Sequence, residues 1–313
     1  MRNSKSYYLI GYAYGAAANT PGCDEAPSVL RSLKLKEKVE SLGHTVIDLG
    51  DTAKAHSPTE EKFVGEKQSE DESLVRNLQA TYSACRSLAE KTTAALQKGG
   101  IPLIVGGDHS LSIGSVAAVS NFFAAQGKEI GLLWIDTHAD INTPTTSPSQ
   151  NIFGMSVAFL LGMIPGALRS LQQKTAIKAE NLAYIGLRDL DPGEKKLLKE
   201  RNILAFSMKE IDILGLAEVT RRALEHIGKN TAGYVVSFDL DVCDPQLVPG
   251  TGTPVRGGLT FREAHLLLEL LADDKRMLSL EMVELNPLLD TNYITADLAI
   301  SLIESALGKT ILD

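Results

Sequence analysis

Two carboxylates and one imidazole occupy alternate positions in the segment WIDTHAD. Asp136, His138 and Asp140 follow a run of apolar residues. Alternate side chains of an extended chain point the same way, so the three are predicted to converge on one point. Clustered carboxylates repel each other and lose hydration, and a divalent cation removes that cost. The segment therefore predicts a metal site, although by itself it is equally typical of a solvated turn or a helix cap.

Two further segments place acids and a histidine after apolar runs. PLIVGGDHS ends in Asp108 and His109, and YVVSFDLDVCDP carries Asp239, Asp241 and Asp244. Asp239 and Asp241 also alternate, and we expect them to converge on a second point. Taken alone, the first segment is compatible with a phosphate-binding turn and the second with ordinary loop chemistry. The three segments together make a shared metal centre the better interpretation.

The number and type of the candidate ligands predict two ions. Six side chains exceed what one ion usually takes, so we expect two metals that share a bridging ligand. Oxygen and imidazole donors without a thiolate favour manganese over zinc, with iron or cobalt as alternatives. The six candidates are His109, Asp136, His138, Asp140, Asp239 and Asp241.

Short apolar runs alternate with amphipathic segments along nearly the whole chain. The predicted strands are Tyr7–Gly11, Thr45–Leu49, Leu103–Val105, Ile130–Ile135, Leu182–Ile185, Leu204–Phe206, Tyr234–Phe238 and Met277–Leu280. The predicted helices are Ser28–Ser41, Glu72–Gln97, Ser112–Ala125, Ala217–Ile227 and Phe261–Leu271. Apolar strands separated by helices indicate an α/β fold with a parallel sheet covered on both faces.

This pattern predicts one doubly wound α/β domain over residues 1–313. The polar stretch Asp51–Asp71 is interpreted as a surface excursion between a strand and a helix, with a domain boundary there as the less favoured alternative. Ligands of such folds bind at the carboxyl ends of the strands. Each acidic segment follows a predicted strand, so all three are expected at one edge of the sheet.

Composition limits the class of protein and its partners. The net charge of −8 argues against a nucleic-acid or anionic-membrane partner, because both reward basic surfaces. Three cysteines, odd in number and far apart, indicate a reducing compartment rather than a disulfide framework. Neither a signal peptide nor an apolar stretch of about 18–20 residues is found. We therefore expect a cytoplasmic protein.

The three segments resemble the signature regions of the ureohydrolase (arginase/agmatinase) family. The resemblance rests on GGDHSLSIGS, WIDTHADINTP and SFDLDVCDP with GTGTPVRGGLT, and extends to GCDEAPSVLR, YIGLRDLDPGE and EMVELNP. It implies an arginase-like three-layer fold with a mostly parallel eight-stranded sheet, and a homo-trimer or hexamer. It also implies a binuclear manganese hydrolase of small guanidino compounds, whose ions the six candidates hold.

The resemblance also implies how a substrate is bound. The segment DINTPTTSPSQN has the length and pattern of the arginase loop that binds the α-carboxylate and α-amino group of arginine. Taken alone, its serines and prolines fit a plain surface loop. By resemblance, the carboxylate meets Asn142, Ser147 and Ser149, the ammonium meets Asp191, the guanidinium meets Glu284, and Thr253 lines the same pocket.

The mechanism that the resemblance implies is attack of a metal-bridging hydroxide on the guanidinium carbon. Glu284 orients that carbon, and Asp140 passes a proton to the leaving amine. L-Arginine then yields L-ornithine and urea.

One catalytic position departs from the family pattern. In NIFGMS, Phe153 stands where arginases usually carry a histidine that acts in proton transfer, and Ser156 replaces a usual proline. Glu281 stands where an aspartate is commoner. The leading prediction is an arginase with slow turnover or altered pH dependence. The alternatives are a hydrolase of agmatine or another guanidino or amidino compound, and a metal-loaded protein that binds without turnover.

Overall fold

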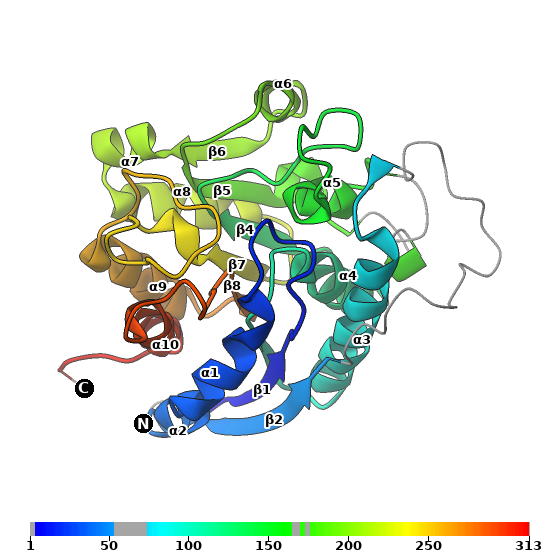
Figure 1. The fold of residues 1–313 in the computed structure, drawn as a ribbon. Helices are drawn as coiled ribbons and strands as arrows, with labels where there is room; N and C mark the ends of the chain where they lie inside the picture. Colours follow the sequence, from blue (N-terminus) through cyan, green and yellow to red (C-terminus); the bar gives the residue numbers. More distant parts are fainter. Residues whose placement is uncertain (1–3, 53–73, 165–169, 173–175, 313) are drawn as a thin grey trace.

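One sheet of eight strands forms the centre of the molecule (Figure 1). The computed structural model describes residues 4–52, 74–164, 170–172 and 176–312. The strand order is β2-β1-β3-β8-β7-β4-β5-β6, and each neighbouring pair is parallel. The strands are β1 Ser6–Gly11, β2 Thr45–Asp51, β3 Ile101–Val105, β4 Gly131–Ile135, β5 Leu182–Leu187, β6 Leu204–Ser207, β7 Tyr234–Asp239 and β8 Met277–Val283.

Helices cover both faces of this sheet. On one side α3 packs on α4 and α4 on α5, whereas on the other α1, α10, α9, α8 and α7 contact one another in that order (Figure 1). The bounds are α1 Ala26–Ser32, α2 Leu35–Glu40, α3 Leu78–Gln97, α4 Leu111–Ala124, α5 Ser156–Leu160, α6 Pro192–Glu200, α7 Met208–Leu214, α8 Leu216–Ile227, α9 Phe261–Asp274 and α10 Ile294–Ala306. The predicted three-layer parallel α/β fold is confirmed.

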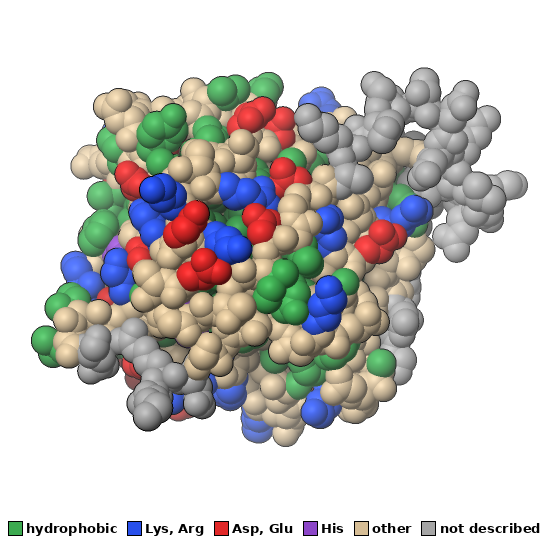
Figure 2. All heavy atoms as spheres, turned by 90° about the horizontal axis from the view of Figure 1, so that it is seen from below, with side chains coloured by type: hydrophobic (Ala, Val, Ile, Leu, Met, Phe, Trp, Pro, Cys, Tyr) green, Lys and Arg blue, Asp and Glu red, His purple; other side chains and the backbone are tan. Residues whose placement is uncertain are grey.

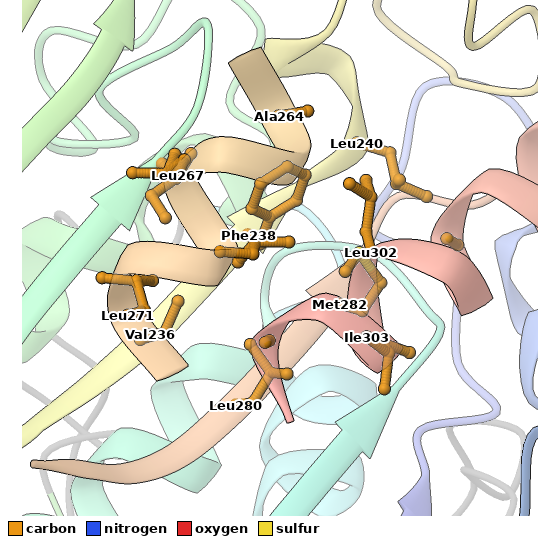
Figure 3. Close-up of a cluster of buried hydrophobic side chains, with 14 of the residues drawn as sticks. Val236, Phe238, Leu240, Ala264, Leu267, Leu271, Leu280, Met282, Leu302 and Ile303 are labelled. Carbon is orange, nitrogen blue, oxygen red and sulfur yellow. The ribbon is translucent and has the colours of Figure 1, made fainter. Parts of the chain in front are cut away.

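The two faces of each central strand enter separate apolar layers. Val236 and Phe238 of β7, with Met282 of β8, point toward α9 and α10 (Figure 3). Val235 of β7 and Trp134 of β4 point into the layer beneath α3 and α4. Burial on both faces explains why these strands read as unbroken apolar runs. Each fully buried large side chain stabilises the fold by about 1.5–3 kcal/mol relative to exposure.

Several predicted element boundaries were wrong. The segment Ser28–Ser41 forms two helices rather than one, because Lys34 takes a left-handed conformation with φ 65° between α1 and α2. The predicted helix Glu72–Gln97 begins at Leu78 among the described residues. Strand β8 extends three residues beyond Leu280, because the charged side chain of Glu281 is buried and hydrogen-bonded rather than exposed.

Four of the described helices, α5, α6, α7 and α10, lie outside the predicted helical ranges, and two of them carry a local start signal. Asp191 with Glu194 forms a capping box at α6, and Ser207 with Glu210 forms one at α7. This S/T/D-x-x-E pattern satisfies the free amides of a helix start. The other two are buried, α5 against α4 and α10 mostly against α9. Of the polar stretch Asp51–Asp71, residues 53–71 lie outside the described residues.

Within the described ranges, no helix is both long and apolar enough to cross a membrane. On the face drawn in Figure 2, basic and acidic side chains are intermixed rather than gathered into one large patch of a single sign. Charge on this face therefore gives no long-range preference for a polyanion.

Candidate active site

Four neighbouring strands deliver polar residues to one edge of the sheet. In the order β3-β8-β7-β4, each carboxyl end is followed within five residues by an ionisable side chain. After β3 the chain turns at Gly106 and Gly107, which have φ values of 80° and 77°. A Cβ atom on Gly107 would lie 2.4 Å from the Tyr12 ring. Glycine is required here so that the turn can bring His109 to the sheet edge.

His109 is the centre of a first ligand group. Its Nδ1 atom lies 3.1 Å from Asp136 Oδ2 and 3.2 Å from both Asp140 Oδ2 and Asp239 Oδ2. All four side chains are buried, and Nδ1 has no hydrogen-bond partner of good geometry among the described residues. Adjacent ligands of an octahedral ion with bonds of about 2.1 Å lie about 3 Å apart. The buried, unpaired Nδ1 and its three oxygens therefore fit a divalent cation.

A second ligand group is centred on His138. Its Nδ1 atom lies 3.1 Å from Asp241 Oδ2 and 3.5 Å from Asp136 Oδ1. Asp136 thus offers one oxygen to each group, so the two groups share a ligand. Hard oxygen donors with imidazole and without thiolate suit manganese, iron or cobalt.

The expected convergence within each segment was wrong. Asp140 faces the His109 group whereas His138 faces the other, and Asp239 and Asp241 are likewise divided between the two groups. The expectation assumed an extended chain, but β4 ends at Ile135 and Asp140 is left-handed with φ 48°. After Asp239 the chain enters a 3-10 turn at Leu240–Val242. Both turns rotate alternate side chains away from one another.

The pKa values of the ligand side chains reflect the concentration of negative charge in the two groups. Burial raises the pKa of Asp239 well above its usual value, and the charges of Asp241 and Asp136 raise it further. Burial also raises the pKa of Asp140. Burial would lower the pKa of His109, but the three carboxylates around it raise that pKa far above the usual value. A bound cation offsets the cost of burying these mutually repelling carboxylates.

Trp134 and Thr253 hold the ligands in place. The Trp134 ring stacks on His109, with centroids 4.0 Å apart and planes 9° apart, while its Nε1 donates to Asp136 Oδ2 at 2.9 Å. Thr253 Oγ1 donates to Asp241 Oδ2 at 3.0 Å. The role of Trp134 was missed, and the only signal for it was the single tryptophan of the chain, two residues before the first ligand.

Glu284 lies beside the first ligand group in a strained conformation. Its φ is 62°, and its Oε1 atom accepts a hydrogen bond from the backbone amide of His109 at 2.8 Å. Left-handed non-glycine residues cluster at functional sites. The Cys23 thiol, missed in the sequence, donates to Glu284 Oε2 at 3.5 Å, and a Cβ atom on Gly252 would lie 3.9 Å from that oxygen. Burial raises the pKa of Glu284, a cost that a guanidinium partner offsets.

The predicted substrate loop lies against the start of α6. Asn142 Nδ2 donates to Asp191 Oδ2 at 2.9 Å, which brings two of the predicted substrate residues together. Ser147 and Ser149 lie side by side with their hydroxyls 3.5 Å apart. Each accepts a backbone amide, from Gln150 at 3.0 Å and from Asn151 at 3.2 Å respectively. The loop is therefore ordered by its own polar groups.

Comparison with known proteins assigns the family. The model named "Arginase family" matches residues 5–308. The chain belongs to the arginase family. An arginase of Staphylococcus aureus (strain MRSA252) is 39% identical over 313 residues, the full length of both chains. The crystal structure of arginase from Bacillus cereus superposes with a TM-score of 0.88 at 36% identity, covering 98% of this chain and 100% of that one.

Other enzymes share the arginase-family fold. Formimidoylglutamase from Bacillus subtilis subsp. subtilis str. 168 matches 98% of this chain and 87% of its own with a TM-score of 0.76. At 20% identity this likeness shows the fold alone.

Phe153 belongs to neither ligand group of this arginase-family chain. It lies in the 3-10 turn Ile152–Met155, and its half-buried ring packs on the apolar layer that contains Trp134 and Met155. Its carbonyl and that of His109 both accept hydrogen bonds from Ser156 Oγ, at 2.9 Å and 3.1 Å. Ser156, which replaces a usual proline, thereby ties the turn to the first metal-binding segment.

Proposed function

We propose that this arginase-family chain hydrolyses L-arginine to L-ornithine and urea with two manganese ions, iron or cobalt being able to replace them. The observation that carries the proposal is the shared Asp136, which joins two His/Asp groups beside a buried, strained Glu284. His109, Asp140 and Asp239 complete one site, and His138 and Asp241 the other.

The reaction assigns separate tasks to Glu284 and Asp140. When bound by these side chains, two divalent ions would supply Lewis acidity and a water of lowered pKa near neutral pH. Glu284 binds the guanidinium through its carboxylate, a pairing that suits the planar fork, and so orients the carbon that is attacked. Asp140, at the first ligand group, hands a proton to the leaving amine.

The amino-acid end of the substrate is assigned to the loop after β4. Asn142, Ser147 and Ser149 offer amide and hydroxyl donors to the carboxylate, and Asp191 offers an acceptor to the ammonium. The contact between Asn142 and Asp191 supports this, because it puts a donor and an acceptor side by side. Thr253 is assigned to the guanidinium pocket because its neighbour Gly252 lies close to Glu284.

Phe153 favours a second version of this function, in which turnover is slow or the substrate is another guanidino compound such as agmatine. A phenyl ring cannot transfer a proton, and the ring packs on apolar residues. In the extreme case the chain binds metal and ligand without turnover.

A urea assay over L-arginine, agmatine and other guanidino compounds, with manganese added, separates these versions. We expect urea from L-arginine, with manganese content near two per chain. If urea is released only from another compound, that compound would replace L-arginine as the assigned substrate. If no compound yields urea at full metal occupancy, the chain would be a protein that binds metal and ligand without turnover.

We infer that residues 1–313 form one domain, because a single sheet collects strands from Ser6 to Val283. We also propose a cytoplasmic location, supported by three free, buried cysteines. By family resemblance we propose a homo-trimer or hexamer. Size-exclusion chromatography with light scattering tests the assembly.

A further inference from the structure

The substrate loop contains a glutamine in an unfavourable conformation. Gln150 has a φ of 63°, in the left-handed region that a non-glycine residue adopts only at a cost. Its side chain is partly buried, and its buried Oε1 atom has no hydrogen-bond partner among the described residues. A buried acceptor without a donor is a second cost. Two such costs at one residue indicate that Gln150 makes a contribution that offsets them.

The nitrogen end of the Gln150 side chain closes the loop on itself. Nε2 donates to the carbonyl of Ser147 at 2.7 Å and to the carbonyl of Pro144 at 3.0 Å. Both neighbours are acceptors, so the two N–H groups of the amide face them and Oε1 faces away. The unpaired Oε1 atom is therefore a consequence of these two bonds, which we call the Gln150 clamp.

The left-handed backbone of Gln150 directs two amides toward the serine hydroxyls. The amides of Gln150 and Asn151 donate to Ser147 Oγ at 3.0 Å and to Ser149 Oγ at 3.2 Å. The two hydroxyls are 3.5 Å apart, too far for a strong bond with each other. A hydroxyl has one proton to donate and two acceptor positions. Because an amide occupies an acceptor position of each oxygen, each O–H remains for a further acceptor such as a carboxylate.

The backbone of Gln150 is itself anchored to other parts of the chain. The amide of Arg76 donates to the Gln150 carbonyl at 2.9 Å, and Arg76 pairs with Asn151 in an isolated parallel bridge. The Asn151 side chain donates to Asn19 Oδ1. The Gln150 clamp therefore acts from a fixed point on the residues that precede it in the loop.

We propose that Gln150 is a positioning residue whose clamp holds Ser147 and Ser149 ready to donate to the carboxylate of the substrate. This inference rests on the proposed function of the loop, and it assigns part of the substrate specificity to a residue that acts through the two serines. A loop that is closed before binding does not lose conformational freedom when the substrate arrives. Loss of the clamp should therefore weaken the binding of substrates that carry a carboxylate, with little effect on the chemical step.

The test compares the steady-state kinetics of Gln150→Gly with those of the parent, both loaded with manganese. Glycine adopts the left-handed conformation freely, so this variant keeps the backbone turn and loses the clamp. We expect KM for L-arginine to rise roughly tenfold through the loss of two hydrogen bonds, with kcat changed less than about twofold. For agmatine, which has no carboxylate, kcat/KM should stay within about twofold of the parent value. Thermal unfolding checks that the variant folds.

A second variant and a second measurement test the donor itself. Gln150→Glu keeps the length of the side chain, but an ionised carboxylate cannot donate to the two carbonyls. Hydrogen exchange of the loop amides does not depend on turnover, and it should be faster by about tenfold in both variants.

Two controls keep the result specific to the clamp. Gln126→Ala removes an exposed glutamine whose side-chain amide donates to the Phe122 carbonyl at 3.3 Å, and it should change neither the kinetics nor the exchange of the loop. In a Ser147→Ala background, Gln150→Gly should raise KM for L-arginine less than it does in the parent, because one of the two positioned hydroxyls is already gone.

The outcomes separate the inference from the proposed function. If the parent hydrolyses L-arginine and Gln150→Gly leaves KM for L-arginine within about twofold, the positioning role is wrong and the proposed function stands. An equal loss with L-arginine and agmatine, or unchanged exchange of the loop amides, would also overturn the role of Gln150. If the parent releases no urea, the proposed hydrolysis is wrong, and calorimetry then compares the dissociation constants of L-arginine and agmatine. In that case Gln150→Gly should still weaken only L-arginine, and the absence of this selective loss would overturn the inference.

Discussion

The two parts of the active site are held together in different ways. The ligand groups are built at the ends of three strands, β3, β4 and β7, from residues as far apart in the chain as His109 and Asp241, and nearly all are buried. The substrate loop, residues 140–151, is ordered mainly by contacts within itself, such as Thr146 Oγ1 to Asn142 Oδ1 at 2.9 Å and Gln150 to Ser147.

Because of this difference, the metal chemistry and the substrate specificity depend on different parts of the structure. Ligands on a packed sheet edge cannot shift without disturbing the core, so the metal chemistry is constrained by the whole fold. A loop that satisfies its own hydrogen bonds changes sequence at little cost to stability. We therefore expect changes in the ligand groups to abolish activity, and changes in the loop to alter which substrate is used.

The largest effect is expected from Asp136→Ala, because Asp136 serves both ligand groups. Both ions should bind more weakly, and kcat/KM for L-arginine should fall by roughly 10³-fold or more, since metal catalysis supplies several kcal/mol. Metal analysis and the urea assay measure the two effects together. Asp48→Asn, at the exposed ion pair with Arg31, is the control. Full activity without bound metal would show that catalysis does not depend on the two ligand groups.

Glu194 joins the two parts, and its effect is on stability. It accepts the amides of Ile141 at 3.2 Å and Asp191 at 2.9 Å, and burial raises its pKa from 4.5 to about 7. The folded state therefore retains a proton that the unfolded state has lost. The associated stability, at most about 3 kcal/mol, is complete below pH 4.5 and is lost as pH rises through 7.

Chemical unfolding between pH 4 and 8, with manganese saturating, measures this dependence. The free energy of unfolding of the parent should fall with pH more steeply than that of Glu194→Gln, which has no titrating group at this position. Parallel curves for the two proteins would show that Glu194 does not link the parts through its charge.

The substrate loop predicts a preference for L-arginine over agmatine. Agmatine lacks the carboxylate, and one charge-assisted contact contributes about 1.5–3 kcal/mol, or roughly 10–100-fold in kcat/KM. Steady-state kinetics on both compounds measure this ratio of kcat/KM values. Asn142→Ala should bring the kcat/KM values for L-arginine and agmatine closer together. Equal or faster turnover of agmatine would remove the loop from substrate recognition.

The smallest expected effect is a gain, from Phe153→His. A positioned imidazole in proton transfer contributes typically about 10²–10⁴-fold, and we expect at least about tenfold in kcat near neutral pH, with metal content unchanged. The parent should then be most active at alkaline pH. Phe153→Leu controls for the loss of the ring. A histidine variant no faster than the parent at every pH would show that proton transfer takes another route.

Much of this site was predictable because its signals are local. Each ligand follows an unbroken apolar run, and such runs identified all eight strands. The capping boxes at Asp191 and Ser207 were equally local, although these helices were not predicted from them. By contrast, the broken helix at Lys34 has no comparable pattern, since its left-handed conformation depends on how α1 and α2 pack.

The sequence by itself determined which side chains are available as ligands and that they follow strands, since residue type and hydrophobic period are properties of short segments. Only the tertiary structure decided how the ligands divide between two groups, why Asp136 belongs to both, and that Trp134 stacks on His109. The physical reason is that strands far apart in the chain become neighbours. Strand order, register and the turns after β4 and β7 arise from packing of the whole sheet.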